Sequence, residues 1–260
     1  MPSTAQSSSV SIQNLLLEVE RRGAGKPLLL LAGEEQLERE APFLDALAKQ
    51  FEVIIPSLPG FGVSERPDWI ANADDISYIL LDLLDKLDLT DVTVLGCSFG
   101  GWVAAEMAVK NTSRISRIVL VDAYGIKVRG PFDRDIMDIW TSHPAEVAAA
   151  KWADVEKGKR DFSQMNDDQL TVVARNIESF ARFCWDPYMH NPKLRERLHR
   201  IDVPALLIWG EKDGIVDTAY GEAYANLIPG AKFATIAGAG HYPHLEAPES
   251  FLATLHPFIN

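Results

Sequence analysis

The sequence has few cysteines, no long apolar run and a shortage of basic residues. Its two cysteines, Cys97 and Cys184, lie far apart in a chain of 260 residues, which argues against a disulfide framework and favours a reducing compartment. No apolar run is long enough to span a bilayer. The 25 Lys and Arg residues against 37 Asp and Glu residues give a formal net charge of −12. Such a surface repels phosphate backbones and anionic lipids, so nucleic acid and membranes are not expected as partners.

The first residues also lack the features of a targeting segment. Met1 to Ser9 is polar and rich in serine, with no charged start followed by an apolar core. We therefore expect a frayed N-terminus and a cytoplasmic location. The composition, 47% apolar and 24% charged, is that of an ordinary globular protein, and a chain of this length buries enough surface to fold without disulfides or structural metals.

Short, unbroken apolar segments alternate with longer helical patterns. Because a strand covered on both faces is apolar throughout, this alternation predicts an α/β fold with a doubly wound, mostly parallel sheet. The expected strands are Pro27–Ala32, Phe51–Ser57, Val92–Cys97, Ile118–Ala123, Ala205–Gly210 and Lys232–Ala237. The expected helices are Asp74–Leu87, Gly100–Lys110, Tyr220–Leu227 and Ser250–Phe258. An antiparallel hairpin is expected over Val10–Glu20, with its turn at Gln13 and Asn14.

One long stretch, from Tyr124 to Asp202, breaks this alternation. It contains no convincing buried strand, and its helical patterns carry many aromatic residues. A structureless loop of that length would be unusual in a compact domain, so we expect a helical cap inserted between two core strands. The predicted division is residues 1–123 with 203–260 as the core, and residues 124–202 as the cap.

The sequence Gly-Cys-Ser-Phe-Gly, from Gly96 to Gly100, separates an expected strand from an expected helix. A serine on such a tight turn is held in a strained conformation at the edge of the sheet, and small neighbours let the backbone and the helix pass close by. The helix N-terminus adds backbone N–H groups where negative charge develops. The pattern indicates Ser98 as a nucleophile, with an ordinary strand–helix turn as the alternative. Cys97 is expected to be a small buried apolar residue.

A nucleophilic serine needs a base, and two histidines follow the last expected strand. Loops at the carboxyl ends of parallel strands are where such sheets build their sites. His241 is preferred because the glycines before it let the loop fold back toward Ser98, whereas Pro243 looks like the start of the final helix. His244 remains the alternative base.

The base needs an acid that fixes its tautomer and stabilises the imidazolium. Asp213 follows the strand that ends at Gly210, and it is the preferred acid. Asp122, at the end of the preceding strand, is the most serious alternative, and Glu211 and Asp217 occupy comparable positions. The chain order of serine, acid and histidine is that of a serine hydrolase built on an α/β sheet.

Four segments together carry a resemblance to the α/β-hydrolase superfamily over nearly the whole chain. They are Pro59–Ser64 (PGFGVS), Gly96–Gly101 (GCSFGG), Trp209–Asp213 (WGEKD) and Gly240–Glu249 (GHYPHLEAPE). The chain resembles the capped branch that contains esterases and C–C hydrolases. The resemblance implies the α/β-hydrolase fold, a Ser–His–Asp triad, a helical cap over the pocket, and no metal or organic cofactor. The expected partner is a small-molecule substrate, and the expected assembly is a monomer or a homodimer.

The segment from Ala32 to Glu35 departs from the family pattern, because relatives carry His-Gly after the corresponding strand. By the resemblance, the backbone N–H groups of Phe99 and Glu34 complete the oxyanion hole. An ionised carboxylate about 5 Å from an oxyanion, at an effective dielectric of about 20, would cost roughly 3 kcal/mol, or about a hundredfold in rate. We therefore expect Glu34 to donate its N–H only, with its side chain turned away or held neutral. Alternatively, Glu34 and Glu35 are solvated loop acids.

The predicted reaction is hydrolysis of an ester, lactone or thioester of a small, fairly apolar molecule through an acyl-enzyme. The substrate pocket is expected to include five aromatic residues, Trp140, Phe180, Phe183, Trp185 and Tyr242. Two alternatives remain: C–C bond hydrolysis of dienones from aromatic degradation, and a small-molecule receptor that does not turn over its ligand. Tyr242 stands where the resemblance predicts tryptophan in a C–C hydrolase.

Overall fold

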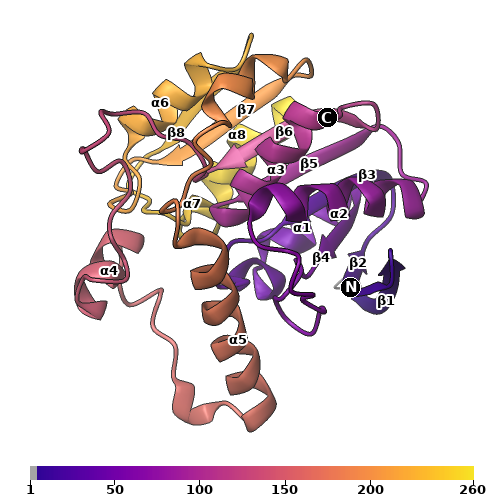
Figure 1. Cartoon of the computed structure of the whole chain (residues 1–260), viewed down its shortest axis with the longest axis horizontal. Helices are drawn as coiled ribbons and strands as arrows, with labels where there is room; N and C mark the ends of the chain where they lie inside the picture. The colour runs from indigo at the N-terminus through magenta and orange to yellow at the C-terminus, as the bar shows by residue number, and fades with distance from the viewer. Residues whose placement is uncertain (1–4) are drawn as a thin grey trace.

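An eight-stranded sheet with the order β1-β2-β4-β3-β5-β6-β7-β8 runs through the molecule (Figure 1). The computed structural model describes residues 5–260, so Met1 to Thr4, part of the N-terminus expected to be frayed, lie outside the described residues. The strands are β1 Gln6–Ile12, β2 Leu15–Arg22, β3 Lys26–Leu31, β4 Phe51–Pro56, β5 Val92–Cys97, β6 Ile115–Val121, β7 Ala205–Gly210 and β8 Lys232–Ile236. The doubly wound, mostly parallel sheet predicted from the apolar segments is confirmed.

The antiparallel part of the sheet lies at its N-terminal edge. β1 pairs with β2, and β2 pairs with β4, both antiparallel, whereas all other pairs are parallel. The hairpin turns at Gln13 and Asn14, whose φ values of 47° and 68° are those of the turns that match strand twist in a two-residue hairpin. The predicted hairpin and its turn are therefore confirmed.

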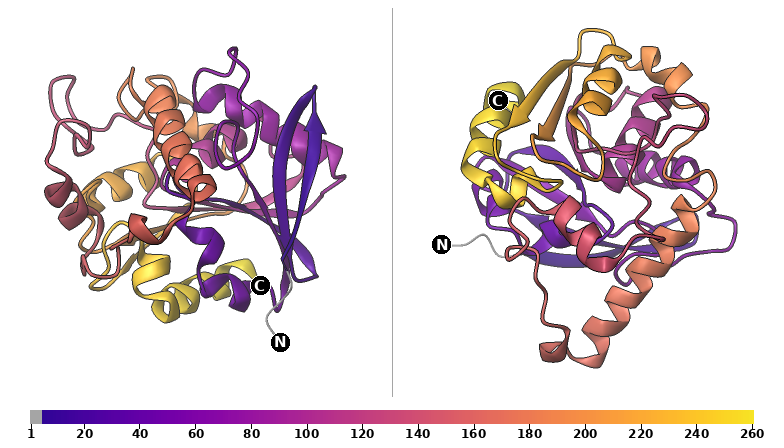
Figure 2. Two further views of the ribbon diagram at one scale, coloured as in Figure 1. Left: turned by 90° about the horizontal axis from the view of Figure 1, so that it is seen from below. Right: turned by 90° about the vertical axis from the view of Figure 1, so that its left-hand side faces the viewer.

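Helices cover both faces of the sheet (Figure 2, left). They are α1 Phe43–Leu47, α2 Ala73–Lys86, α3 Phe99–Lys110, α4 Pro144–Lys151, α5 Asp167–Cys184, α6 Thr218–Asn226, α7 Pro243–Glu246 and α8 Pro248–Ile259, with short 3-10 helices η1 Leu37–Glu40, η2 Phe162–Gln164 and η3 Arg195–Arg200.

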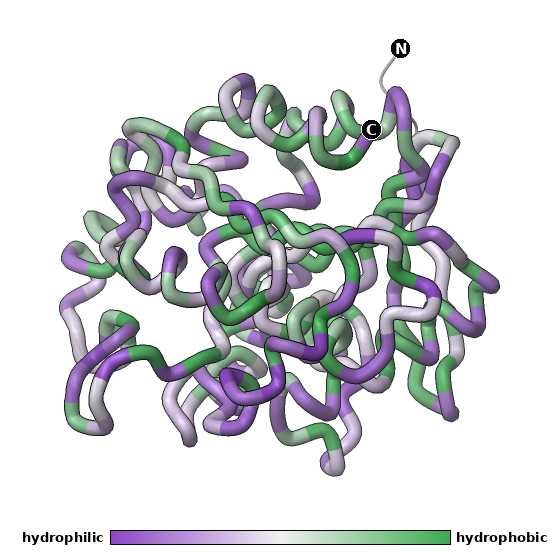
Figure 3. Tube along the Cα trace, turned by 90° about the horizontal axis from the view of Figure 1, so that it is seen from above, coloured by the Kyte–Doolittle hydropathy of each residue, from purple (hydrophilic) through white to green (hydrophobic). Residues whose placement is uncertain are grey.

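Two hydrophobic cores result, one on each face. The helices α2, α3 and α6 pack on one face, and α1 and α8 on the other. Successive residues of β5 alternate between the two cores, so that Val94 joins the first and Leu95 and Cys97 the second. This is why the strands are apolar throughout, and why hydrophobic residues gather in the middle of the chain trace (Figure 3). Cys97 is buried and its thiol is free, as expected for an apolar core residue.

The helix α3 passes unusually close to the sheet. A Cβ atom added to Gly100 would lie 2.1 Å from the carbonyl oxygen of Leu31 in β3, and one added to Gly96 would lie 2.5 Å from the carbonyl oxygen of Gly100. Real Cβ atoms do not approach backbone so closely, so glycine is required at both positions for the turn between β5 and α3.

Between β6 and β7 the chain forms α4, η2, α5 and η3 rather than a further strand. Helix α5 begins at a capping box, in which Asn166 and Gln169 each accept a hydrogen bond from the other's backbone N–H. Its C-terminal half buries Phe180 and Phe183 against the core, whereas its first turns project from the body (Figure 2, right). At 18 residues α5 is long, yet neither it nor any other helix within residues 5–260 is long and apolar enough to cross a membrane.

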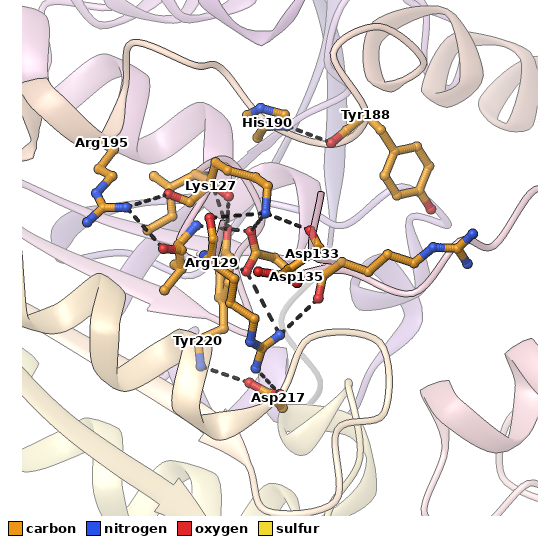
Figure 4. A network of polar contacts seen from close by, with 12 residues as sticks. Lys127, Arg129, Asp133, Asp135, Tyr188, His190, Arg195, Asp217 and Tyr220 are labelled. Atoms are coloured by element: carbon orange, nitrogen blue, oxygen red, sulfur yellow. Dashed lines mark hydrogen bonds and ion pairs between the residues drawn. The ribbon is translucent and has the colours of Figure 1, made fainter. Parts of the chain in front are cut away.

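A polar network holds the start of this insertion against the core (Figure 4). Asp135 accepts hydrogen bonds from the backbone N–H groups of Val128 and Arg129, at 3.0 and 2.9 Å, and pairs with Lys127 at 2.5 Å. The Arg129 guanidinium also contacts Asp217, which caps the N-terminus of α6. The chain that leaves β6 is thereby tied to the helix that follows β7.

The close approach at Gly100 gives a stability prediction. We expect Gly100→Ala to lower the free energy of unfolding by about 3 kcal/mol or more, because the added methyl group must displace the backbone of β3. The matched control is Gly230→Ala, where the new Cβ meets nothing within 4 Å and only the positive φ of 69° is unfavourable, at about 1 kcal/mol. Urea unfolding followed by circular dichroism measures both, and equal losses would contradict the steric argument.

Candidate active site

Ser98 lies on the turn between β5 and α3 in a backbone conformation that residues with a side chain rarely adopt. Its φ and ψ are 51° and −117°, and its N–H donates to the carbonyl of Val121 in β6 at 2.8 Å. Such a conformation costs about 1–3 kcal/mol and persists only where the surrounding structure imposes it. The neighbouring Phe99 is the first residue of α3, so its N–H has no acceptor within the helix and is available to a ligand.

Three sequence-predicted residues meet at this turn. The Oγ atom of Ser98 lies 2.8 Å from Nε2 of His241, and Nδ1 of the same imidazole lies 2.7 Å from Oδ2 of Asp213. The other oxygen of Asp213 accepts the N–H groups of Ile215 and Val216 at 2.8 and 3.1 Å. With the carboxylate fixed at Nδ1, the imidazole presents the lone pair of Nε2 to the serine hydroxyl, the arrangement that proton abstraction requires.

His244 and Asp122, the main alternatives for the base and the acid, have other partners. His244 pairs through Nε2 with Glu38 at 3.2 Å rather than with Ser98. Asp122 accepts the N–H of Gly210 at 2.9 Å. Burial, and then the neighbouring Asp213 carboxylate, raise the pKa of Asp122 well above its usual value, which favours its protonated form.

Glu211 and Asp217, the other two candidate acids, accept hydrogen bonds from the backbone. Glu211 accepts the N–H of Gly238 at 2.9 Å, and Asp217 accepts the N–H of Tyr220 at the start of α6. Neither hydrogen bond involves a histidine.

Tyr124, which the sequence analysis did not single out, completes the surroundings of the imidazole. Its hydroxyl lies 3.0 Å from Nε2 of His241, and its ring stacks on the imidazole with centroids 5.3 Å apart at 15°. The only sequence signal was its place just beyond the carboxyl end of β6, the strand beside β5.

The side chain of Glu34 corrects an expectation. It does not turn away: its Oε2 atom accepts a hydrogen bond from Ser98 Oγ at 2.8 Å. Glu34 is only 4% exposed. Burial alone would raise its pKa, but Lys151, then His241, its own backbone N–H and Ser98 lower the pKa to about 2. The carboxylate is therefore ionised and faces Ser98, and it is neither a solvated loop acid nor neutral.

The counter-charge comes from Lys151 at the end of α4. Its ammonium lies 3.0 Å from Oε1 of Glu34 and also contacts Glu35. Burial alone would lower the pKa of Lys151, but these two carboxylates outweigh burial and raise it. The backbone of α4 also helps to position the imidazole, because the carbonyl of Lys151 accepts the N–H of His241 at 2.7 Å. Sequence reasoning missed Lys151, whose only signal was a basic residue ending a helix.

A cavity of about 210 Å³ lies beside the two carboxylates, and two of the predicted aromatic residues, Trp140 and Phe180, line it. Two others lie nearby. Phe183 stacks on Phe99 with centroids 6.3 Å apart, and the Tyr242 hydroxyl lies 3.4 Å from Glu34.

Trp185 does not join this group. Its side chain is 63% exposed just beyond α5 and is absent from the cavity lining, so its assignment to the pocket was wrong. The remaining lining is mixed, with four apolar residues and five charged or polar ones: Ile139, Phe162, Val173, Ile177, Glu34, Glu35, Lys151, Arg160 and Asn176.

Two buried groups could each offer three ligand atoms to a metal ion, all within 4.8 Å of one another. They are Asp122, Asp213 and His241, and Glu38, Cys97 and His244. In each group a histidine is already hydrogen-bonded to a carboxylate of the same group.

The chain is similar to known hydrolases over most of its length. The chain is 25% identical over 252 residues to a 2-hydroxymuconate semialdehyde hydrolase of Pseudomonas sp. (strain CF600), with 91% of this chain and 88% of that protein covered. It is 24% identical to a pimeloyl-[acyl-carrier protein] methyl ester esterase of Legionella pneumophila, with 94% and 99% covered. It also matches the biotin biosynthesis bifunctional protein BioHC of Teredinibacter turnerae at 25% identity, but spans only 40% of that protein's length.

Solved structures share the fold. The esterase RhEst1 from Rhodococcus sp. ECU1013 superposes with a TM-score of 0.75 at 21% identity, with 100% of this chain and 98% of that chain covered. The family model described as "Alpha/beta hydrolase family" matches residues 28–254, which is most of the chain. Because this model covers well over half of the chain, the chain belongs to the alpha/beta hydrolase family and is a hydrolase.

Proposed function

We propose that the protein hydrolyses a carboxylic ester, lactone or thioester of a small, fairly apolar molecule, with Ser98 as the nucleophile, His241 as the base and Asp213 as the orienting acid. The observation that carries this proposal is the unbroken chain of hydrogen bonds from Ser98 through His241 to Asp213, at 2.8 and 2.7 Å. All three residues are buried, where such a chain is screened least by water.

The reaction would proceed in two halves. Ser98 Oγ forms a bond to the acyl carbon as its proton passes to Nε2 of His241. The N–H of Phe99 stabilises the oxyanion, and the N–H of Glu34 can join it only when released from Glu34's own carboxylate. Collapse of this intermediate expels the alcohol or thiol, which takes the proton from Nε2 and leaves an acyl-enzyme. Water then gives its proton to His241 and attacks the acyl carbon, and the free acid is released with Ser98 restored.

The insertion is proposed to act as a cap, with residues 124–202 over a core of 1–123 and 203–260. It contributes Lys151, whose ammonium pairs with Glu34, and Trp140 and Phe180, which line the cavity beside that carboxylate. The six apolar residues among the lining suit a small apolar acyl chain.

C–C bond hydrolysis is the second candidate, because a 2-hydroxymuconate semialdehyde hydrolase is among the relatives that match along most of the chain. The ester reaction is preferred because a methyl ester esterase matches over 94% of the chain, against 91% for the semialdehyde hydrolase, and because Tyr242 replaces the expected tryptophan. Rates on short p-nitrophenyl esters and on aromatic dienones, measured side by side, separate the two candidates.

Removing the nucleophile gives the first functional prediction. Ser98→Ala is expected to lower kcat on a short p-nitrophenyl ester by about 10³-fold or more, and to abolish labelling by a fluorophosphonate probe, because the covalent step is lost. The exposed Ser113→Ala variant serves as the control and should be labelled like the wild type. A wild-type protein that resists the probe, yet gains thermal stability from a small ligand, would instead favour the receptor alternative.

The two neighbouring aspartates are expected to respond differently to the same substitution. Asp213→Asn should lower kcat by about 10⁴-fold, since an amide at Nδ1 of His241 holds the wrong tautomer. Asp122→Asn should lower kcat by less than about tenfold, because an amide resembles the protonated carboxyl group that burial favours there. Steady-state kinetics on the same ester measures both variants. If Asp122→Asn proved the more damaging, the assignment of the orienting acid would be reversed.

A further inference from the structure

The two oxygens of the Glu34 carboxylate have different partners. Oε1 lies 3.0 Å from the ammonium of Lys151 and 3.4 Å from the Tyr242 hydroxyl. Oε2 accepts its side-chain hydrogen bond from Ser98 Oγ, at 2.8 Å. The serine hydroxyl therefore has two acceptors at equal distance, Glu34 and His241, for its single proton.

The proposed reaction removes one of these hydrogen bonds. When the Ser98 proton passes to His241 and Oγ bonds to the acyl carbon, the oxygen has no hydrogen left to donate. Oε2 of Glu34 then loses its side-chain donor, and it stays without that donor for the lifetime of the acyl-enzyme. The carboxylate keeps its own backbone N–H as a partner, but a buried charged oxygen that loses a side-chain donor is still destabilised, because burial limits its contact with solvent.

The neighbouring side chains are occupied elsewhere. Lys151 is shared between Oε1 of Glu34 and the carboxylate of Glu35. The Tyr242 hydroxyl is nearer to Glu35, at 3.2 Å, than to Glu34. Tyr124 bonds to His241, and no hydrogen bond joins it to Glu34 in the part of the chain that the structure describes.

We propose that the substrate supplies the missing donor, and that the protein prefers acyl groups with a hydroxyl on the carbon next to the scissile carbonyl. This inference rests on the hydrolysis proposed at Ser98. The donor must belong to the acyl part, because the leaving group has departed while Oε2 still lacks its partner. Among acyl positions, the α-carbon is bonded directly to the carbonyl carbon that Ser98 attacks, and so brings a donor nearest to Oε2.

A neutral hydroxyl fits better than an ammonium group. Lys151 already places one positive charge on the Glu34 carboxylate, and His241 becomes positively charged when it takes the serine proton. Arg160 adds a further cation to the lining of the adjacent cavity. A substrate ammonium would meet three positive charges against the two carboxylates of Glu34 and Glu35, whereas a hydroxyl satisfies Oε2 without adding charge.

Four ethyl esters of similar size test the preference: those of lactic acid, 2-methoxypropanoic acid, 2-fluoropropanoic acid and alanine. The methoxy and fluoro esters retain electron withdrawal but have no donor. We expect kcat/KM, measured by pH-stat titration, to be about 10- to 100-fold higher for ethyl lactate than for either. Equal rates would overturn the proposal, and a faster reaction of the alanine ester would overturn the choice of a neutral donor.

Variants identify the group responsible. Glu34→Ala, which removes the acceptor, should bring the lactate preference close to one, whereas Glu35→Ala, which removes the other carboxylate on Lys151, should retain it. A preference that persists in Glu34→Ala would overturn the assignment to Oε2. The comparison of esters with the wild-type enzyme stands even if Glu34→Ala fails to fold.

The proposed function and the substrate preference fail in different ways. Absence of turnover for every ester, together with an unlabelled Ser98, would contradict hydrolysis itself. Hydrolysis of all the esters without preference would leave hydrolysis standing and contradict only the role of Glu34.

Discussion

The strained backbone at Ser98 is the constraint on which the arrangement of the site depends. Ser98, with a φ of 51°, must be held in this conformation by its surroundings. Gly96 and Gly100 provide them, because they allow α3 to pack closely against β3. The same turn directs Oγ toward His241 and frees the N–H of Phe99 at the start of α3. Packing between a helix and a sheet thereby fixes the position of the Ser98 hydroxyl.

Much of the fold could be predicted because its signals are local. Unbroken apolar segments identified the strands covered on both faces, and Gln13–Asn14 identified the hairpin turn. The meeting of Ser98, His241 and Asp213 was also predictable, because each follows a strand of one parallel sheet, and such strand ends gather at one edge.

The surroundings of Glu34 could not be predicted, since they depend on contacts between distant parts of the chain. Lys151 is 117 residues from Glu34, and its approach depends on how the insertion folds over the core. The orientation predicted for Glu34 was wrong because the repulsion between its carboxylate and an oxyanion was estimated without the positive charge of Lys151. Trp185 was misplaced for a related reason, because its aromatic character gave no sign that α5 ends before it with the side chain facing solvent.

The last turn of α4 joins the insertion to both loops of the site. The carbonyl of Ala150 accepts the N–H of Gly214, beside Asp213, and the carbonyl of Lys151 accepts the N–H of His241. Lifting α4 outward to admit a substrate would break both bonds and disturb the base and its acid together. An opening that leaves the base and its acid undisturbed must therefore keep α4 in place, and an insertion transplanted from a relative would restore these contacts only if it brought an equivalent helix end with it.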